Sequence, residues 1–148
     1  MSVTKEIHCP ECGCSISNDY MSADRARRYF FAAIRDAWAN LPEQHKERFP
    51  NSEVLRKTAL IHAGHCDVIT LAVGSKAAAP QIAAAFRMKD AYCVASVRGD
   101  VVTVYTARSM ARRVLLKKEF LAVAEKVFAW IAETTGVNPA QSHEARAA

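Results

Sequence analysis

The apolar residues of this chain change their spacing once, and that change constrains the fold more than any other feature of the sequence. Phe30, Ile34 and Trp38 recur at intervals of four, which predicts an amphipathic helix that runs to about residue 40. Between residues 68 and 73, apolar and β-branched side chains follow one another without a helical period, which predicts a buried strand. The chain is therefore expected to combine helices with a sheet.

Capping and turn residues divide the rest of the chain into further elements. Gly64 and Gly136 are expected to end helices and Pro80 to begin one, because glycine suits the residue after a helix and proline suits its first turn. Gly99-Asp100 is a two-residue hairpin turn between two strand-like runs. The expected elements are helices over about 51–61, 80–89 and 117–134, and strands over 92–98 and 101–107.

These elements predict one α+β domain over residues 21–136. Its small sheet of about three strands would include a β-hairpin and be packed by three to four helices. A chain of 148 residues is long enough for one such domain with its own core. Residues 1–20 are polar and cysteine-bearing, and are expected to form a zinc-knuckle-like segment. Residues 137–148 are small and polar, and are expected to form a flexible tail.

The N-terminal segment contains Cys9-Pro10-Glu11-Cys12 followed by Gly13, a pattern typical of a zinc knuckle. Proline pre-sets a tight turn, and glycine lets backbone N–H groups approach the sulfurs, so that both thiolates can face one metal ion. A structural zinc ion takes four ligands, and the chain has no second Cys-x-x-Cys pair. We therefore predict a structural zinc ion held in part by Cys9 and Cys12.

The other two zinc ligands can be local or distant in the sequence. His8 and Cys14 are the local candidates, whereas a second group lies at the end of the second helix. His62 and Cys66 have the spacing with which finger-type sites supply their second half, which gives the candidate ligand set Cys9, Cys12, His62 and Cys66. Alternatively, His62 and His65 are surface residues at a helix end and Cys66 is a small core residue. A homodimer that shares one zinc ion between two knuckles is a third arrangement.

The balance of charge favours an anionic partner. The formal net charge is +5 and the isoelectric point is about 9.1, as suits nucleic acid or an acidic protein surface. The eleven residues from Arg108 to Lys118 contain five cations and no acid, although any one of these side chains could simply be solvated. The residues expected to contact phosphates are Arg25, Arg28, Arg108, Arg112, Arg113, Lys117 and Lys118.

Motifs of catalysis and of export are absent from the sequence. It contains no H-E-x-x-H, no G-x-S-x-G and no phosphate-binding P-loop, and no residue has the surroundings of a catalytic group, so we lean against an enzyme. Three of the five cysteines fall within six residues, which favours metal binding in a reducing compartment over a disulfide framework. Without an apolar stretch of signal-peptide or membrane-spanning character, the protein is expected to be soluble, cytoplasmic and not membrane-bound.

Three stretches resemble small phage and prophage proteins of recombination gene clusters, the NinB-like and neighbouring families. They are Asp24-Arg-Ala-Arg-Arg-Tyr-Phe-Phe, the run from Ser52 to Gly64, and Val104-Tyr-Thr-Ala-Arg-Ser-Met continuing to Phe120. Together they span most of residues 22–131, although each consists of common residue types. The resemblance implies a phage-encoded accessory of recombination that associates with single-stranded DNA, and it brings no catalytic residue. The N-terminal knuckle departs from the lambda-type pattern.

Three functional hypotheses follow from the sequence. The first is a phage-type protein that binds single-stranded DNA and carries a structural zinc ion. The second is a protein-interaction module, such as a phage-encoded inhibitor that docks its basic face on an acidic host or defence protein. The third is an enzyme whose site is assembled from dispersed residues. Salt-dependent binding to random oligonucleotides distinguishes the first hypothesis from the second.

Overall fold

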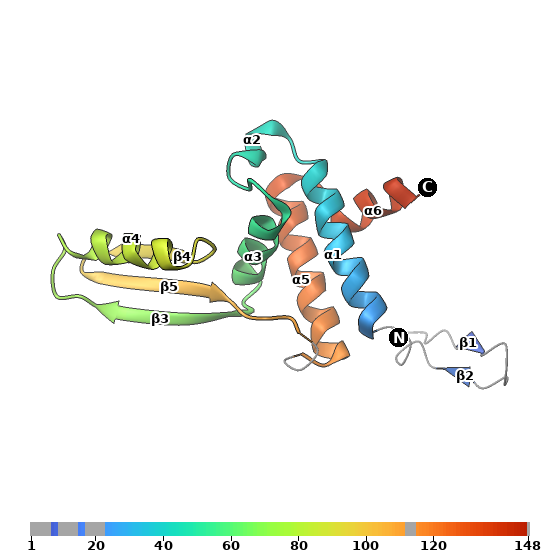
Figure 1. Cartoon of the computed structure of the whole chain (residues 1–148), viewed down its shortest axis with the longest axis horizontal. Coiled ribbons are helices and arrows are strands. Elements are labelled where there is room, and N and C mark those ends of the chain that lie inside the picture. The colour runs from blue at the N-terminus through green and yellow to red at the C-terminus, as the bar shows by residue number, and fades with distance from the viewer. Residues whose placement is uncertain (1–6, 9–14, 17–22, 112–114, 148) are drawn as a thin grey trace.

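A computed structural model of the chain describes residues 7–8, 15–16, 23–111 and 115–147 (Figure 1). It confirms the α+β class, the three-stranded sheet and the β-hairpin, and the described residues form six helices rather than three or four. The elements are β1 (Ile7–His8), β2 (Ser15–Ile16), α1 (Ala23–Ala39), α2 (Glu43–Lys46), α3 (Ser52–His62), β3 (Cys66–Ala72), α4 (Ala79–Lys89), β4 (Val94–Arg98), β5 (Val101–Ala107), α5 (Lys117–Thr135) and α6 (Pro139–Ala147).

The helices α1, α3, α5 and α6 pack together into one body with a large aromatic core. The Phe30 ring of α1 stacks on that of Phe128 with centroids 5.6 Å apart, and meets Phe120 edge-on at 5.4 Å. Leu55 and Leu60 of α3 and Ile131 of α5 are fully buried in the same core. The helical period of the apolar residues thus produced the stripe that α1 buries.

The sheet and α4 form an arm that extends away from the helical body (Figure 1). Its strand order is β3-β5-β4, with both neighbours antiparallel to β5. A second, separate core lies between α4 and the sheet. It is built from small side chains, which are Ala79, Ala83, Ala95, Val102 and Val104. The sequence had predicted that several helices would pack on the sheet; among the described elements, α4 covers one face of it and α3 contacts β5.

The strand β3 is more exposed than its apolar sequence predicted. Val68 is 53% exposed and Ile69 is 47% exposed, so the expectation of a buried strand is wrong. The physical reason is position: β3 is an edge strand, and α4 packs on β4 and β5 instead. An apolar run specifies a strand but does not specify what covers its two faces.

The C-terminal residues form a helix where a flexible tail was expected. Asn138 accepts a hydrogen bond from the backbone N–H of Ala140, and α6 then packs on α1. The carboxylate of Asp36, which is 7% exposed, lies 2.9 Å from Nδ1 of His143 and 3.2 Å from Nε of Arg146. These long-range contacts hold the segment in place, and local composition does not reveal them.

Two further findings concern the N-terminus and the membrane. The strands β1 and β2 pair antiparallel, with Ile7 opposite Ile16 and His8 opposite Ser15, so they flank residues 9–14. Cys9 and Cys12 lie outside the described residues. None of the helices in the described part of the chain combines the length and the apolar character needed to cross a bilayer.

Candidate nucleic-acid interface

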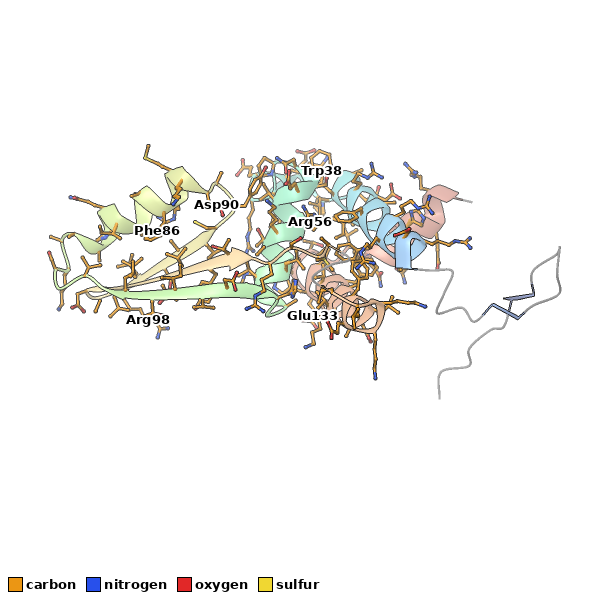
Figure 2. All side chains as sticks on the ribbon, turned by 60° about the horizontal axis from the view of Figure 1, so that its bottom comes forward. Trp38, Arg56, Phe86, Asp90, Arg98 and Glu133 are labelled. Carbon is orange, nitrogen blue, oxygen red and sulfur yellow. The ribbon has the colours of Figure 1, made fainter. Side chains whose placement is uncertain are left out.

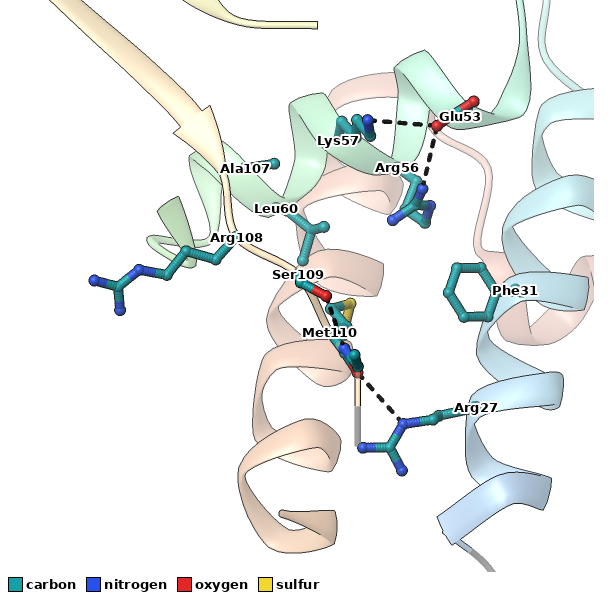
Figure 3. Close-up of a pocket in the computed structure, with 11 residues that line it drawn as sticks. Arg27, Phe31, Glu53, Arg56, Lys57, Leu60, Ala107, Arg108, Ser109 and Met110 are labelled. Atoms are coloured by element: carbon teal, nitrogen blue, oxygen red, sulfur yellow. Dashed lines mark hydrogen bonds and ion pairs between the residues drawn. The ribbon is translucent and has the colours of Figure 1, made fainter. Parts of the chain in front are cut away.

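A cleft opens where α1, α3 and the segment after β5 meet (Figure 3). Its volume is about 460 Å³. One wall is formed by residues 108–111, which we call the strap. Four cationic side chains and one acidic side chain belong to its lining. These residues are Arg27, Arg56, Lys57, Arg108 and Glu53, with Phe31 among the apolar residues beside them.

A second hollow of about 330 Å³ adjoins the cleft along α1 and α3. The two hollows share Phe31, Glu53 and Arg56, and the second adds Arg35. We call the two together the basic groove. Phe31, at the junction, is 39% exposed, so its ring is open to solvent on one side. A cationic groove with an accessible aromatic ring is the usual arrangement for binding single-stranded nucleic acid.

The cations of α3 are fixed by local contacts. Asn51 caps the helix by accepting a hydrogen bond of 2.9 Å from the Val54 N–H. In the first turn of α3, Glu53 lies 3.7 Å from Arg56 and 3.4 Å from Lys57, pairs that helical spacing brings together. Glu53 also accepts a hydrogen bond of 3.2 Å from the Tyr92 hydroxyl. One acid therefore orients two cations without neutralising both.

The two cations of α3 also lie over aromatic rings. The Arg56 guanidinium is 5.1 Å from the centre of the Phe31 ring, and the Lys57 ammonium is 4.0 Å from that of Tyr92. Burial lowers the pKa of Arg56 from its usual value, whereas the neighbouring Glu53 raises it. Arginine starts from so high a pKa that it stays cationic near neutral pH. The groove therefore keeps its positive charge.

Arg27 holds the strap in position. Its Nε donates to the carbonyl of Met110 at 3.3 Å and its Nη2 to the carbonyl of Leu115 at 2.8 Å. The same guanidinium lies 4.7 Å from the centre of the Phe120 ring. Arg112 and Arg113 fall outside the described residues, but the carbonyls on either side of residues 112–114 are bound by this one side chain. Both ends of the segment that carries them are therefore anchored beside the groove.

Arg108 lines the cleft, but its guanidinium points elsewhere. Its Nε donates to Asp67 of β3 at 2.7 Å, and this partner raises the pKa of Arg108. Figure 3 shows the guanidinium directed away from Arg56 and Lys57. In the same strap, the carbonyl oxygen of Ser109 lies 3.0 Å from Nε2 of His65. Arg108 thus joins the arm to the body.

The remaining predicted phosphate contacts lie on two helices. Arg25 and Arg28 are exposed on α1, and the seven-residue spacing of Arg28 and Arg35 places both on the side of the helix that carries Phe31. Arg25 lies one turn before Arg28 and about 120° around the helix from Phe31. Lys117 and Lys118 form the first turn of α5, where the positive end of the helix dipole disfavours cations.

Sequence reasoning missed the cations that the fold brings together in the groove. Arg27, Arg35, Arg56 and Lys57 were not among the predicted contacts, because the sequence places Arg27 beside Arg28 and Arg56 beside Lys57 but does not show which side chains line one groove. For Arg56 and Lys57 a signal existed in their spacing from Glu53, which places all three on one face of α3. For Arg27 the signal is absent, since its partners follow 83 and 88 residues later.

The distant candidates for zinc ligation have protein contacts of their own. The His62 ring stacks on Trp130 with centroids 4.8 Å apart and an interplanar angle of 8°. Burial lowers the pKa of His62, and the nearby charge of Arg48 lowers it further. The Cys66 thiol lies 3.7 Å from the carbonyl oxygen of Ile61. Among the residues that the structure describes, no three or more His, Cys, Asp or Glu side chains gather as a metal site, and Cys9 and Cys12 are not among those residues.

Comparison of the chain with protein-family models, with curated proteins and with solved structures finds no significant match in any of the three.

Proposed function

We propose that this protein binds single-stranded nucleic acid in the basic groove, as a phage-type accessory protein of the cytoplasm. The observation that supports the proposal is the groove itself, where cations from α1 and α3 and the exposed ring of Phe31 line two adjoining hollows. Cations that follow a phosphate backbone supply affinity, and an aromatic face accepts any base, so the expected binding is strong at low salt and tolerant of sequence.

Different residues have different parts in this proposal. Arg35, Arg56 and Lys57 bind phosphates, and Phe31 stacks on a base that is unpaired and therefore accessible. Arg27 keeps the strap beside the groove, so that the strap's flanking cations, Arg112 and Arg113, can extend the track of phosphate contacts. The first turn of α5, with Lys117 and Lys118, follows the strap in the chain and offers a further place for a phosphate.

The proposal is tested by the salt dependence of oligonucleotide binding. Changing Arg35 and Lys57 together to alanine removes two contacts and should reduce the log–log salt slope by about 1.4, at about 0.7 per contact with a single strand. Phe31→Leu should weaken binding about 5- to 150-fold, the equivalent of about 1–3 kcal/mol for one stacked base, with little change in the slope. Fluorescence anisotropy with a random single-stranded oligonucleotide measures both quantities.

The matched control changes Lys89 and Arg98 together to alanine. It removes the same charge from exposed positions on the arm, outside both hollows, and should leave the slope unchanged. Equal losses in the two double variants would show that net charge alone attracts the oligonucleotide. If the parent protein does not bind single strands even at low salt, the proposal fails and the second hypothesis, an acidic protein partner for the same face, replaces it.

We further propose that the N-terminal segment holds a structural zinc ion through Cys9 and Cys12, completed by His62 and Cys66 or by His8 and Cys14. Two described features fit such a site. The β1–β2 pairing brings together the two ends of the segment that carries Cys9 and Cys12, and the lowered pKa of His62 favours the neutral imidazole that zinc needs. Zinc bound there would supply folding free energy rather than catalysis.

Elemental analysis of the purified protein should find about one zinc ion per chain, or half of one if a dimer shares it. Changing Cys9 and Cys12 together to serine should abolish the metal. Changing His62 to glutamine and Cys66 to serine together distinguishes the ligand sets, because zinc is lost with the distant set and retained with the local one. A metal-free protein whose five cysteines all react freely with a thiol reagent would exclude the site.

A further inference from the structure

The outer edge of β3 is an unpaired strand edge. In the part of the chain that the structure describes, β3 pairs with β5 alone, and Figure 1 shows it along one side of the arm. Two hydrogen bonds bracket the strand, Arg108 N–H to His65 O at 3.1 Å and Val73 N–H to Asp100 O at 2.9 Å. They fix the alternation of the ladder, so that odd-numbered residues of β3 bond to β5 and even-numbered residues point their N–H and C=O groups outward. The outward-facing residues are Cys66, Val68, Thr70 and Ala72.

The opposite edge of the sheet is protected in a way that β3 is not. Val104 of β5 forms its backbone hydrogen bonds with Ile69 of β3, so Ala95, which lies opposite Val104 on β4, forms none with β5. The carbonyl of Ala95 therefore points to the outer edge of β4. Arg87 of α4 donates to this carbonyl at 2.6 Å and so places a charged side chain over the β4 edge. Charged groups, prolines and bulges are the usual means of blocking a strand edge. β3 has no proline, its register is continuous, and its one charge is Asp67.

The side chains of β3 are also uncovered. Ile69 shares a face with Val104, which is buried against α4, yet Ile69 is 47% exposed because α4 lies over the neighbouring strands. On the other face of the sheet Val68, opposite Tyr105, is 53% exposed. Figure 2 shows α4, with Phe86, along one side of the sheet. The apolar side chains of β3, which make its sequence resemble that of a buried strand, are therefore left exposed in the single chain.

We propose that β3 pairs antiparallel with β3 of a second copy of this chain, which gives a continuous six-stranded sheet. A two-fold axis through Thr70 would set Thr70 opposite Thr70 of the second copy, Val68 opposite its Ala72, and Ile69 opposite its Leu71. In this register the outward N–H and C=O groups of one β3 edge face the outward C=O and N–H groups of the other. Each large apolar side chain lies opposite a side chain of similar or smaller size. The two helical bodies, each with its basic groove, lie at opposite ends of the dimer.

Charge favours a second copy over a foreign strand. The protein carries a net charge of +5, but β3 holds only Asp67, and that carboxylate is bound by Arg108 of its own chain. Two β3 edges therefore meet without repulsion between like charges. An acidic segment of another protein would find no cation along Val68–Ala72, and a basic one would find only a carboxylate that is already paired. The edge is neutral and apolar, so a second copy of the same edge complements it.

Analytical ultracentrifugation of the purified full chain tests this dimer. The parent should sediment at twice the monomer mass of 16.3 kDa, with a concentration-dependent dissociation to monomer. Thr70→Lys should give a monomer, because two lysines would meet at the two-fold axis. Thr103→Lys is the matched control: Thr103 lies directly opposite Thr70 on the central strand, so it places the same charge on the same face but not at the edge. It should leave the dimer intact.

Each alternative result identifies a different error. A parent that stays monomeric at every concentration overturns the proposal. Loss of the dimer in both lysine variants shows that two sheets pack face to face, which also overturns it. A dimer that a chelator dissociates is held by zinc at the N-terminus and not by β3. Ala72→Lys places the same charge on the β3 edge at the end of the strand, and it replaces Thr70→Lys if that variant does not fold. Circular dichroism checks that each variant is folded.

Discussion

His62 illustrates how a single residue that looked like a metal ligand gains a second explanation from the fold. It ends α3, and its imidazole stacks on Trp130 of α5 at a centroid distance of 4.8 Å. The Arg48 guanidinium lies over the same Trp130 ring, 5.7 Å from its centre. The burial of the ring and the charge of Arg48 both disfavour the imidazolium, so the pKa of His62 is lowered in the folded protein.

This shift makes a prediction about stability against pH. In the unfolded chain His62 has its ordinary pKa near 6.5, so between that value and the lower folded value the unfolded state binds more protons. The contribution of His62 is therefore fully present above about pH 6.5 and is lost as the pH falls through the folded pKa. Urea denaturation at a series of pH values from 8 to 5 measures the free energy of unfolding. The parent should lose more of it on acidification than His62→Gln, and parallel curves would contradict the assignment.

At the same scale, the sequence could reveal where cations are frequent but not where they meet. The window 108–118 stands out as a run, and Lys117 and Lys118 do lie at one helix end. The groove is instead lined by residues such as Arg27 of α1 and Arg56 of α3, which come from different elements. A run of charge is local information, whereas a groove depends on how α1 and α3 pack together.

At the scale of elements, the sequence predicted those whose signals are local. Gly136 ends α5 with a positive φ of 76°, a conformation in which glycine is not strained, and Gly99 with φ of 60° forms the hairpin turn. Asn51 caps α3 by accepting a hydrogen bond from the Val54 N–H. These boundaries were predictable because the residue that ends an element lies next to it in the chain.

The elements that the sequence failed to predict depend on distant partners. The helix α6 has a polar, alanine-rich sequence with few apolar side chains, and it is held by Asp36, 107 residues before His143. Tyr29 adds an edge-on contact with the His143 ring at 5.1 Å. For β3 the strand was predicted but its exposure was not, because the cover of a sheet is set by the path of α4 and not by the sequence of the strand.

At the scale of the whole molecule, two cores of unequal size share one chain. The body buries three phenylalanines and several leucine and isoleucine side chains, whereas three of the five buried residues in the arm core are alanines. Burial of apolar area is the main source of stability, at about 25 cal/mol per Å², so the arm has much less of it. The arm is joined to the body by the strap, whose Arg108 binds Asp67, and by Tyr92, which contacts Glu53 and Lys57 of α3. The arm is therefore expected to open without the body.

Native-state hydrogen exchange measures this difference, at a protein concentration where the chain is monomeric. Amides of β5 should exchange with a lower opening free energy than those of α1 and α5, as in a protein with separate cooperative units. Val102→Ala in the arm and Val127→Ala in the body form a matched pair, because both side chains are fully buried and lose the same two methyl groups. Val102→Ala should lower the protection of β3, β4 and β5 by about 2 kcal/mol, or about 30-fold, and leave α1 and α5 unchanged. Val127→Ala should lower the protection of α1 and α5. If Val102→Ala instead lowers protection equally throughout the chain, the two cores unfold as one unit and the arm is not independent.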